Sequence, residues 1–202
     1  LEEIDRVKGL GFRCITVPTH QGNRGLDHSE SRKILRRAAE LEFPVFIHPA
    51  DWEGNPFMDR GSMNAVGWPF DTSLAVWRMM VGGVLDEIPS LKIVLHHMGA
   101  MIPFFRYRIN QWLKKYAKLN KRLEDYAKQI YVDTAIEGGS VADLMVAYSL
   151  FGPKRILFGS DWPYVEARAS IGENLAAIRA APISDEEKDM ILGKNVMDLL
   201  KI

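Results

Sequence analysis

The 202-residue sequence contains one cysteine, Cys14, and no excess of charge of either sign. A single cysteine excludes an intrachain disulfide and is typical of a reducing compartment, so we expect a cytoplasmic protein. Lysine plus arginine and aspartate plus glutamate each number 26, which gives a formal net charge of zero. The chain lacks the basic excess that neutralises phosphates, and we therefore expect no nucleic-acid partner.

Long apolar runs are also lacking. A membrane-spanning helix needs about 20 consecutive apolar residues, and no stretch approaches that length, so we expect no membrane association. The first five residues are acidic where a signal peptide would be basic. Apolar residues recur at helical spacing from the first position: Leu1, Ile4, Val7 and Leu10. This pattern predicts that the sequence starts within a helix, part-way through a fold.

The composition is that of an ordinary globular protein, with 47% hydrophobic and 26% charged residues. This length suits one domain over residues 1–202. Short β-rich runs alternate with amphipathic helical stretches. The strands are expected at Phe12–Val17, Pro44–His48, Leu91–His96, Gln129–Thr134 and Arg155–Ser160. The helices between them are expected at about Ser29–Leu41, Asp71 or Thr72 to Val81, Pro103–Lys128 and Val141–Phe151, with three more in the tail.

Strand–helix alternation predicts an α/β fold with a parallel sheet and right-handed crossovers. Five strands can form an open, doubly wound sheet. They can also be the last five strands of a (β/α)8 barrel. The strand count leaves both architectures open.

Groups suited to metal or proton chemistry end three of the five expected strands. His48 ends the second strand, His96 and His97 end the third, and Asp161 follows the fifth. Active sites of parallel α/β folds lie at the carboxyl ends of the strands, and imidazole and carboxylate bind divalent metals such as zinc. Adjacent strand residues point to opposite faces, so we expect only one of the two neighbouring histidines to enter the site.

Five stretches carry a resemblance to a known family: Ile47-His48-Pro49, Gly67-Trp68-Pro69-Phe70-Asp71-Thr72, Gly82-Gly83-Val84-Leu85-Asp86-Glu87-Ile88-Pro89, His97-Met98-Gly99-Ala100-Met101-Ile102-Pro103 with Arg108-Ile109, and Phe158-Gly159-Ser160-Asp161-Trp162-Pro163-Tyr164. The sequence resembles the amidohydrolase-2 family, most of all its decarboxylase branch. That branch includes aminocarboxymuconate-semialdehyde, resorcylate and carboxyvanillate decarboxylases. The resemblance implies a (β/α)8 TIM barrel of the metal-dependent hydrolase type, of which this chain holds the last five β/α units.

The resemblance also implies roles for single residues. His48 is similar to the metal-binding histidine at the end of the fifth barrel strand. His97 is similar to the catalytic histidine after the sixth strand, because the proline of that motif follows six residues later, and this selects it over His96. Asp161 is similar to the aspartate of the eighth strand that binds or borders the metal. Arg108 matches an arginine that binds a substrate carboxylate, in some members from the neighbouring subunit.

The chain departs from the family pattern in two ways. Met98, Ala100 and Met101 replace most of a glycine run after the catalytic histidine, which implies a bulkier pocket wall. The His-x-His pair that supplies two metal ligands in the family is absent, so two further histidine ligands are expected upstream of residue 1. The other two histidines, His20 and His28, lie in a polar loop and are expected to be solvated.

The function implied by the resemblance is non-oxidative decarboxylation of an aromatic or unsaturated, muconate-like carboxylic acid. The implied cofactor is one divalent metal, zinc or, as second choice, manganese. His97 would act as general base or proton shuttle, and Asp161 would bind the metal and help to move the proton. Trp52 and Trp68 suit a flat, apolar substrate wall, and Arg108 would bind a carboxylate.

Two other functions remain open from the residues. The same scaffold supports a metal-dependent hydrolase, such as a lactonase, in which metal-bound hydroxide attacks an ester. The second alternative is a non-catalytic scaffold or binding protein.

The expected partner is a small-molecule carboxylic acid, and a homodimer or larger oligomer is expected because an arginine acting across subunits requires at least two copies.

Overall fold

A computed structural model describes residues 1–51, 61–164 and 168–202, with only the backbone for residues 168–170. Five strands form the main sheet: β1 (Ile15–Pro18), β4 (Val45–His48), β5 (Ile93–Leu95), β6 (Ile130–Asp133) and β7 (Ile156–Leu157). The helices are α1 (Glu2–Gly9), α2 (Ser29–Glu40), α3 (Trp68–Val81), α4 (Val84–Glu87), α5 (Arg106–Tyr116), α6 (Leu123–Tyr126), α7 (Val141–Phe151), α8 (Asn174–Ala180), α9 (Asp185–Asp189) and α10 (Asn195–Leu200).

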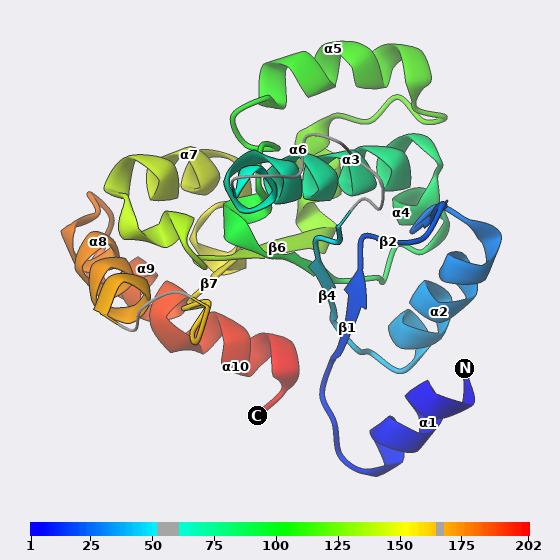
Figure 1. Ribbon diagram of the computed structural model, residues 1–202, viewed down its shortest axis with the longest axis horizontal. Helices are drawn as coiled ribbons and strands as arrows, with labels where there is room; N and C mark the ends of the chain where they lie inside the picture. Colours follow the sequence, from blue (N-terminus) through cyan, green and yellow to red (C-terminus); the bar gives the residue numbers. More distant parts are fainter. Residues whose placement is uncertain (52–60, 165–167) are drawn as a thin grey trace.

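The sheet is parallel throughout, and its spatial order β1-β4-β5-β6-β7 is the order of the sequence. Helices lie between successive strands, as they do in consecutive β/α units of a barrel (Figure 1). The prediction of an α/β fold with a parallel sheet is thereby confirmed. All five expected strands are present, and each is shorter than expected. All five strands run in one direction, so their carboxyl ends meet along one edge of the sheet.

The two faces of the sheet are covered differently. Residues of α2, α3 and α7 pack with one set of strand residues in a large buried core. A small second cluster contains the alternate strand residues Val94 and Leu157, packed against Leu199 of α10. Figure 1 shows α3 and α7 on one side of the sheet and α10 on the other. Alternation along each strand therefore separates residues of the helix-covered face from those of the α10 face.

Helix α3 begins earlier than expected. It starts at Trp68 with Pro69 in its first turn, and a π-helical turn at Met63–Gly67 leads into it. The prediction that this helix starts at Asp71 or Thr72 is wrong, since both residues are buried within it. The Asp71 carboxylate accepts hydrogen bonds from other segments instead. The expected end is confirmed, because Gly82 is the C-cap.

A short antiparallel hairpin lies within the loop after β1, where only a polar loop was expected. It pairs β2 (His20–Gln21) with β3 (Arg24–Gly25) around Gly22 and Asn23. Gly22 has φ +58°, a backbone conformation that suits glycine in a tight hairpin turn. This ribbon places His20 beside the carboxyl edge of β1.

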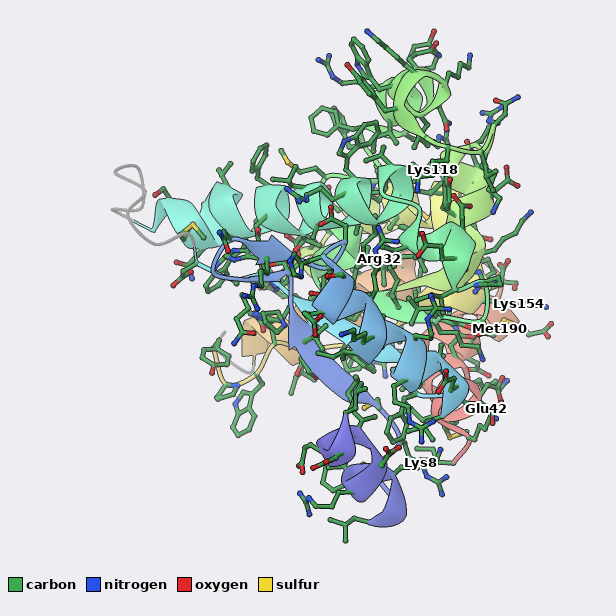
Figure 2. The ribbon with its side chains drawn as sticks, turned by 90° about the vertical axis from the view of Figure 1, so that its right-hand side faces the viewer. Lys8, Arg32, Glu42, Lys118, Lys154 and Met190 are labelled. Carbon is green, nitrogen blue, oxygen red and sulfur yellow. The ribbon has the colours of Figure 1, made fainter. Side chains whose placement is uncertain are left out.

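Helix α5 lies outside the main helix layer. Figure 1 and Figure 2 both show α3 between α5 and the sheet. Aromatic side chains of α5 and the turn before it are exposed, with Phe104 at 76% and Tyr107 at 78%. In the described ranges, no helix has the length and apolar character needed to cross a bilayer.

The turn after β5 depends on Gly99. This residue has φ +76°, and a Cβ atom there would lie 2.9 Å from Cγ1 of the buried Val132. We expect Gly99→Ala to lower the free energy of unfolding by about 2 to 4 kcal/mol, through left-handed backbone strain and overpacking. Urea denaturation measures this loss.

Gly11→Ala is the matched control, because Gly11 also has positive φ (+87°) but has nothing within 4 Å of the added carbon. It should lose only the backbone contribution of about 1 to 2 kcal/mol. Equal losses in the two variants would show that the contact with Val132 does not constrain the turn.

Candidate metal and acid–base site

Three polar side chains form one row across the carboxyl edge of the sheet. The pairing of β4 with β5 and of β5 with β6 puts His48, His96 and Asp133 at successive positions of that row. Each follows by two residues an apolar side chain of the small cluster on the α10 face. Because strand residues alternate between faces, the row belongs to that same face.

His48 is oriented by its own backbone. Its Nδ1 lies 2.7 Å from the carbonyl oxygen of Pro49. This contact selects the neutral tautomer with hydrogen on Nδ1 and leaves the lone pair on Nε2. The His48 ring meets those of His96 and His97 edge-on, with centroids 5.3 and 6.1 Å away.

The second imidazole of the row is held by a carboxylate. His96 Nδ1 lies 2.5 Å from Asp133 Oδ2, while Asp133 Oδ1 accepts hydrogen bonds from the backbone N–H of His97 (3.0 Å) and of Ala135 (3.2 Å). Burial lowers the pKa of His96, but the hydrogen bond to Asp133 and the charges of Asp133 and Asp161 together raise this pKa above its usual value. The pair is therefore a fixed, charge-assisted contact.

His97 has the opposite electrostatic character. Its side chain is almost fully buried, at 4% exposure. Burial lowers the pKa of His97, helped by the neighbouring His96 and His48, and the charges of Asp133 and Asp161 only partly oppose this. The pKa values of these two adjacent imidazoles are therefore shifted in opposite directions.

The prediction that only one of these neighbours enters the site is wrong. Both rings lie beside His48, because the backbone is still extended at His96 and strand alternation ends only at the next residue, His97. His97 has φ +60°, which turns the chain sharply. Further non-glycine residues with positive φ follow the strand ends: Met98, Ala100, Ile136 and Asp161. Such backbone strain concentrates at functional sites and is held by surrounding contacts.

Asp161 lies in the segment that follows β7 (Ile156–Leu157) and is half-buried. Its charge acts on both His96 and His97, so it belongs to the same electrostatic environment. Across residues 1–51, 61–164 and 168–202, no three His, Cys, Asp or Glu side chains are grouped closely enough to hold a metal ion.

Of the expected substrate-wall residues, Trp68 reaches the site and Trp52 lies outside the described residues. The Trp68 ring meets His48 edge-on with centroids 5.9 Å apart. Its indole Nε1 donates a hydrogen bond to Asp51 Oδ1 at 2.8 Å. Trp68 therefore presents a fixed aromatic surface next to the imidazole row.

Arg108 is placed elsewhere. It is exposed on α5 and lines a cavity of about 490 Å³ with Trp77, Trp112 and other residues of α3 and α5. No residue of the strand-end row lines this cavity. Within the part of the chain that the structure describes, Arg108 forms no ion pair.

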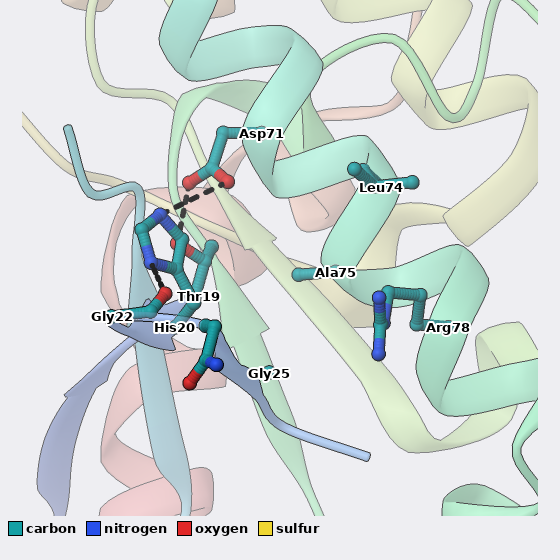
Figure 3. Close-up of a pocket in the computed structure, with 9 residues that line it drawn as sticks. Thr19, His20, Gly22, Gly25, Asp71, Leu74, Ala75 and Arg78 are labelled. Carbon is teal, nitrogen blue, oxygen red and sulfur yellow. Dashed lines mark hydrogen bonds and ion pairs between the residues drawn. The ribbon is translucent and has the colours of Figure 1, made fainter. Parts of the chain in front are cut away.

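His20 is not solvated, contrary to expectation. Its side chain is only 17% exposed, and Nε2 lies 3.7 Å from Asp71 Oδ1. Asp71 also accepts hydrogen bonds from the Thr19 hydroxyl and, at 2.9 Å, from the backbone N–H of Ala50. Figure 3 shows this group beside a cavity of about 260 Å³. Asp71 thus ties the end of β1 to the segment after His48.

His28 has a structural place at the start of α2. Its side chain is the N-cap of that helix and accepts a hydrogen bond from the backbone N–H of Glu30 at 3.3 Å. This residue is half-buried and has no contact with the strand-end row.

A comparison with protein families decides the classification. The family model described as Amidohydrolase matches residues 1–202, the whole sequence. The chain belongs to the amidohydrolase family.

Relatives of this amidohydrolase include decarboxylases. The 2-amino-3-carboxymuconate-6-semialdehyde decarboxylase of Dictyostelium discoideum is 27% identical over 99% of the chain and 56% of its own length. The solved 5-carboxyvanillate decarboxylase of Sphingomonas paucimobilis is 27% identical with a TM-score of 0.87, over 100% of the chain and 62% of its own. A 5-carboxyvanillate decarboxylase of Novosphingobium aromaticivorans, solved with manganese, has 24% identity and a TM-score of 0.85, over 100% and 60%. The chain thus spans about three fifths of the length of these proteins.

Another titratable group of this amidohydrolase lies near the row. Glu137, in the turn after β6, has one buried carboxylate oxygen, Oε2, with no hydrogen-bond partner in the described residues. Burial, together with the charges of Asp133, Asp143 and Asp161, raises the pKa of Glu137 to about 7. Glu137 is therefore a carboxylic acid that stays protonated at mildly acidic pH.

The sequence analysis placed His96 at a strand end but preferred His97 for the site, and it missed Asp133, Asp71 and Glu137 as members of this edge. The signal for Asp133 was present, because it ends a buried strand in the same way as His48. The environment of Asp71 and Glu137 depends on contacts between distant segments, which no local pattern reports.

Glu137 gives the amidohydrolase a measurable pH dependence of stability. Its pKa in the folded protein lies above the usual value of 4.5, so the protonated form stabilises the fold, and this contribution is lost as pH rises from about 4.5 to about 7. We expect Glu137→Gln to raise the free energy of unfolding at pH 8 by about 2 kcal/mol, and much less at pH 4.5.

Urea denaturation of wild type and variant across this pH range tests the expectation. Glu186→Gln, at an exposed position of α9, is the control and should leave the pH profile unchanged. A Glu137→Gln profile parallel to that of wild type would exclude a raised pKa at Glu137.

Proposed function

We propose that this chain is part of a metal-dependent, non-oxidative decarboxylase and carries those site residues that lie at the carboxyl ends of its strands. The substrate class is an aromatic or unsaturated, muconate-like carboxylic acid. The observation that carries the proposal is the meeting of His48, His97 and Trp68 at one edge of the sheet, with Asp161 in the same electrostatic environment. Decarboxylases of such acids are among the relatives of the chain.

The residues present fit a divalent metal. His48 has its Nδ1 engaged by a carbonyl group, which is the usual arrangement of a metal-binding imidazole. Asp161 adds a carboxylate from the segment after β7. We propose His48 and Asp161 as ligands, with two further histidine ligands from outside residues 1–202. Manganese and zinc both suit imidazole and carboxylate donors, and the manganese of the Novosphingobium aromaticivorans relative supports manganese.

When bound, the metal would neutralise substrate oxygens and so lower the barrier to loss of the carboxylate. His97 is the proton-handling group in this proposal, since burial lowers its pKa and so favours the neutral imidazole, which can take up a proton and pass it on. The reaction breaks the bond between the substrate carbon and its carboxylate. Carbon dioxide leaves, and a proton takes its place on that carbon.

The apolar surface of Trp68 suits a planar acid, because its ring is fixed by the hydrogen bond to Asp51. Arg108 remains our proposed carboxylate-binding residue, acting from a second copy of the chain in a homodimer or larger oligomer. Its exposure among the aromatic side chains of α5 supports a contact with another subunit.

The rival function on the same residues is ester or lactone hydrolysis. Product analysis separates the two, because only decarboxylation releases carbon dioxide. With the natural protein that contains this chain, we expect carbon dioxide from 5-carboxyvanillate or 2,6-dihydroxybenzoate. In deuterated water, deuterium should appear on the vacated carbon. Lactone opening without release of carbon dioxide would support the hydrolase. A protein that shows neither of the two activities and binds no metal would support the scaffold alternative.

We expect His97→Asn to reduce the rate of carbon dioxide release between about 100-fold and 10,000-fold, the range for losing a positioned acid–base group. Metal content should be retained. His28→Asn is the matched control, because Asn also caps helices and the site lies elsewhere. A variant at His97 with wild-type turnover would remove this residue from the mechanism.

A further inference from the structure

His96 has no role in the function proposed above, although it stands in the same row as His48. The two rings have centroids 5.3 Å apart and planes inclined by 62°. Two imidazoles that share one metal ion through bonds of roughly 2.1 Å have ring centroids roughly 5 Å apart. The spacing of His48 and His96 therefore matches that of two ligands of one metal ion.

The orientation of His96 is also that of a ligand. Its Nδ1 is bound to Asp133 Oδ2 at 2.5 Å, so the carboxylate holds the hydrogen on Nδ1 and leaves Nε2 as the donor atom. Asp133 itself is held by the backbone N–H groups of His97 and Ala135. Carboxylate–histidine pairs of this kind orient metal-binding imidazoles and strengthen their basicity.

If His96 had only a structural role, we would expect its ring to be packed against other side chains and buried. Its ring does lie 6.1 Å from that of Phe46, but it also keeps 21% of its side chain exposed at the edge of the sheet. His48 shows the same pattern, with Nδ1 engaged and a half-buried ring. The two neighbouring strands thus present equivalent imidazoles.

We propose that His96 is a metal ligand of this protein, next to His48, and that Asp133 is the positioning residue that orients it. This inference rests on the proposed metal-dependent function. It gives the chain two adjacent imidazole ligands, one at the end of β4 and one directly after β5. Acid–base work is thereby left to His97.

The test is cobalt(II) binding to the natural protein that contains this chain. Affinity is measured by competition with a chelator, and the visible d–d spectrum reports the ligands. His96→Asn is the informative variant, because the amide nitrogen of Asn can replace Nδ1 against Asp133 while the Nε2 donor is lost. We expect at least a 100-fold loss of affinity and an altered spectrum.

Asp133→Asn should weaken cobalt(II) binding about 10-fold to 100-fold, the usual effect of losing the group that orients a ligand, and should keep the wild-type spectrum. His48→Asn serves as the positive control and His28→Asn as the negative one. Circular dichroism confirms that each variant is folded, and Asp133→Asn decides the question if His96→Asn does not fold.

The outcomes are distinct. If His96→Asn and Asp133→Asn bind cobalt(II) with wild-type affinity and spectrum while His48→Asn does not, His96 is not a ligand and the metal-dependent function stands. If the wild-type protein binds none of the three metals cobalt(II), manganese and zinc, the proposed function fails and this inference fails with it.

Discussion

The parallel register of the five strands is the constraint on which the rest of the site depends. Each strand is short, and buried β-branched and leucine residues fix its place in the sheet. Because side chains alternate with a period of two, the register that buries Val94 on the α10 face also sets His96 on that face, next to His48. A slip of one residue would send the row to the helix-covered face.

The electrostatics of the edge follow from that geometry. Asp133 uses both carboxylate oxygens, one for the His96 side chain and one for two backbone N–H groups. It therefore fixes the conformation of the turn after β5 and raises the pKa of His96 in the same contact. The same negative charge helps to keep Glu137 protonated. The charge of this one buried carboxylate thus acts to raise the pKa of each neighbouring group, and the pKa of His97 is lowered because burial outweighs that effect.

The sequence was sufficient for features governed by local pattern. Strand runs and the strand-end rule identified His48 and Asp161 as groups at one edge, and the Ser184–Glu187 capping box is present in the structure. The predictions were wrong where contacts between distant segments determine the structure. Asp71 has the chemistry of a helix cap, but Thr19 and Ala50 donate to it across the sheet edge. The Gly22-Asn23 turn was a usable hairpin signal, but its flanking residues are polar and short, so the pattern was missed.

The error over His96 and His97 has a more general cause. Alternation holds only while φ stays in the extended region, and the four residues from His97 to Ala100 all have positive φ. Left-handed backbone at three non-glycine residues costs of order 1 to 3 kcal/mol each, so other contacts must impose it. Here they are the Asp133 hydrogen bond at one end, the buried Met98 in the middle, and the packing of Gly99 on Val132 and Phe151. The position of the His97 ring is therefore set by the core beneath the turn as much as by the strand. Substitutions in that core should therefore alter the proposed proton transfer at His97 by displacing its backbone, without changing a polar group of the site.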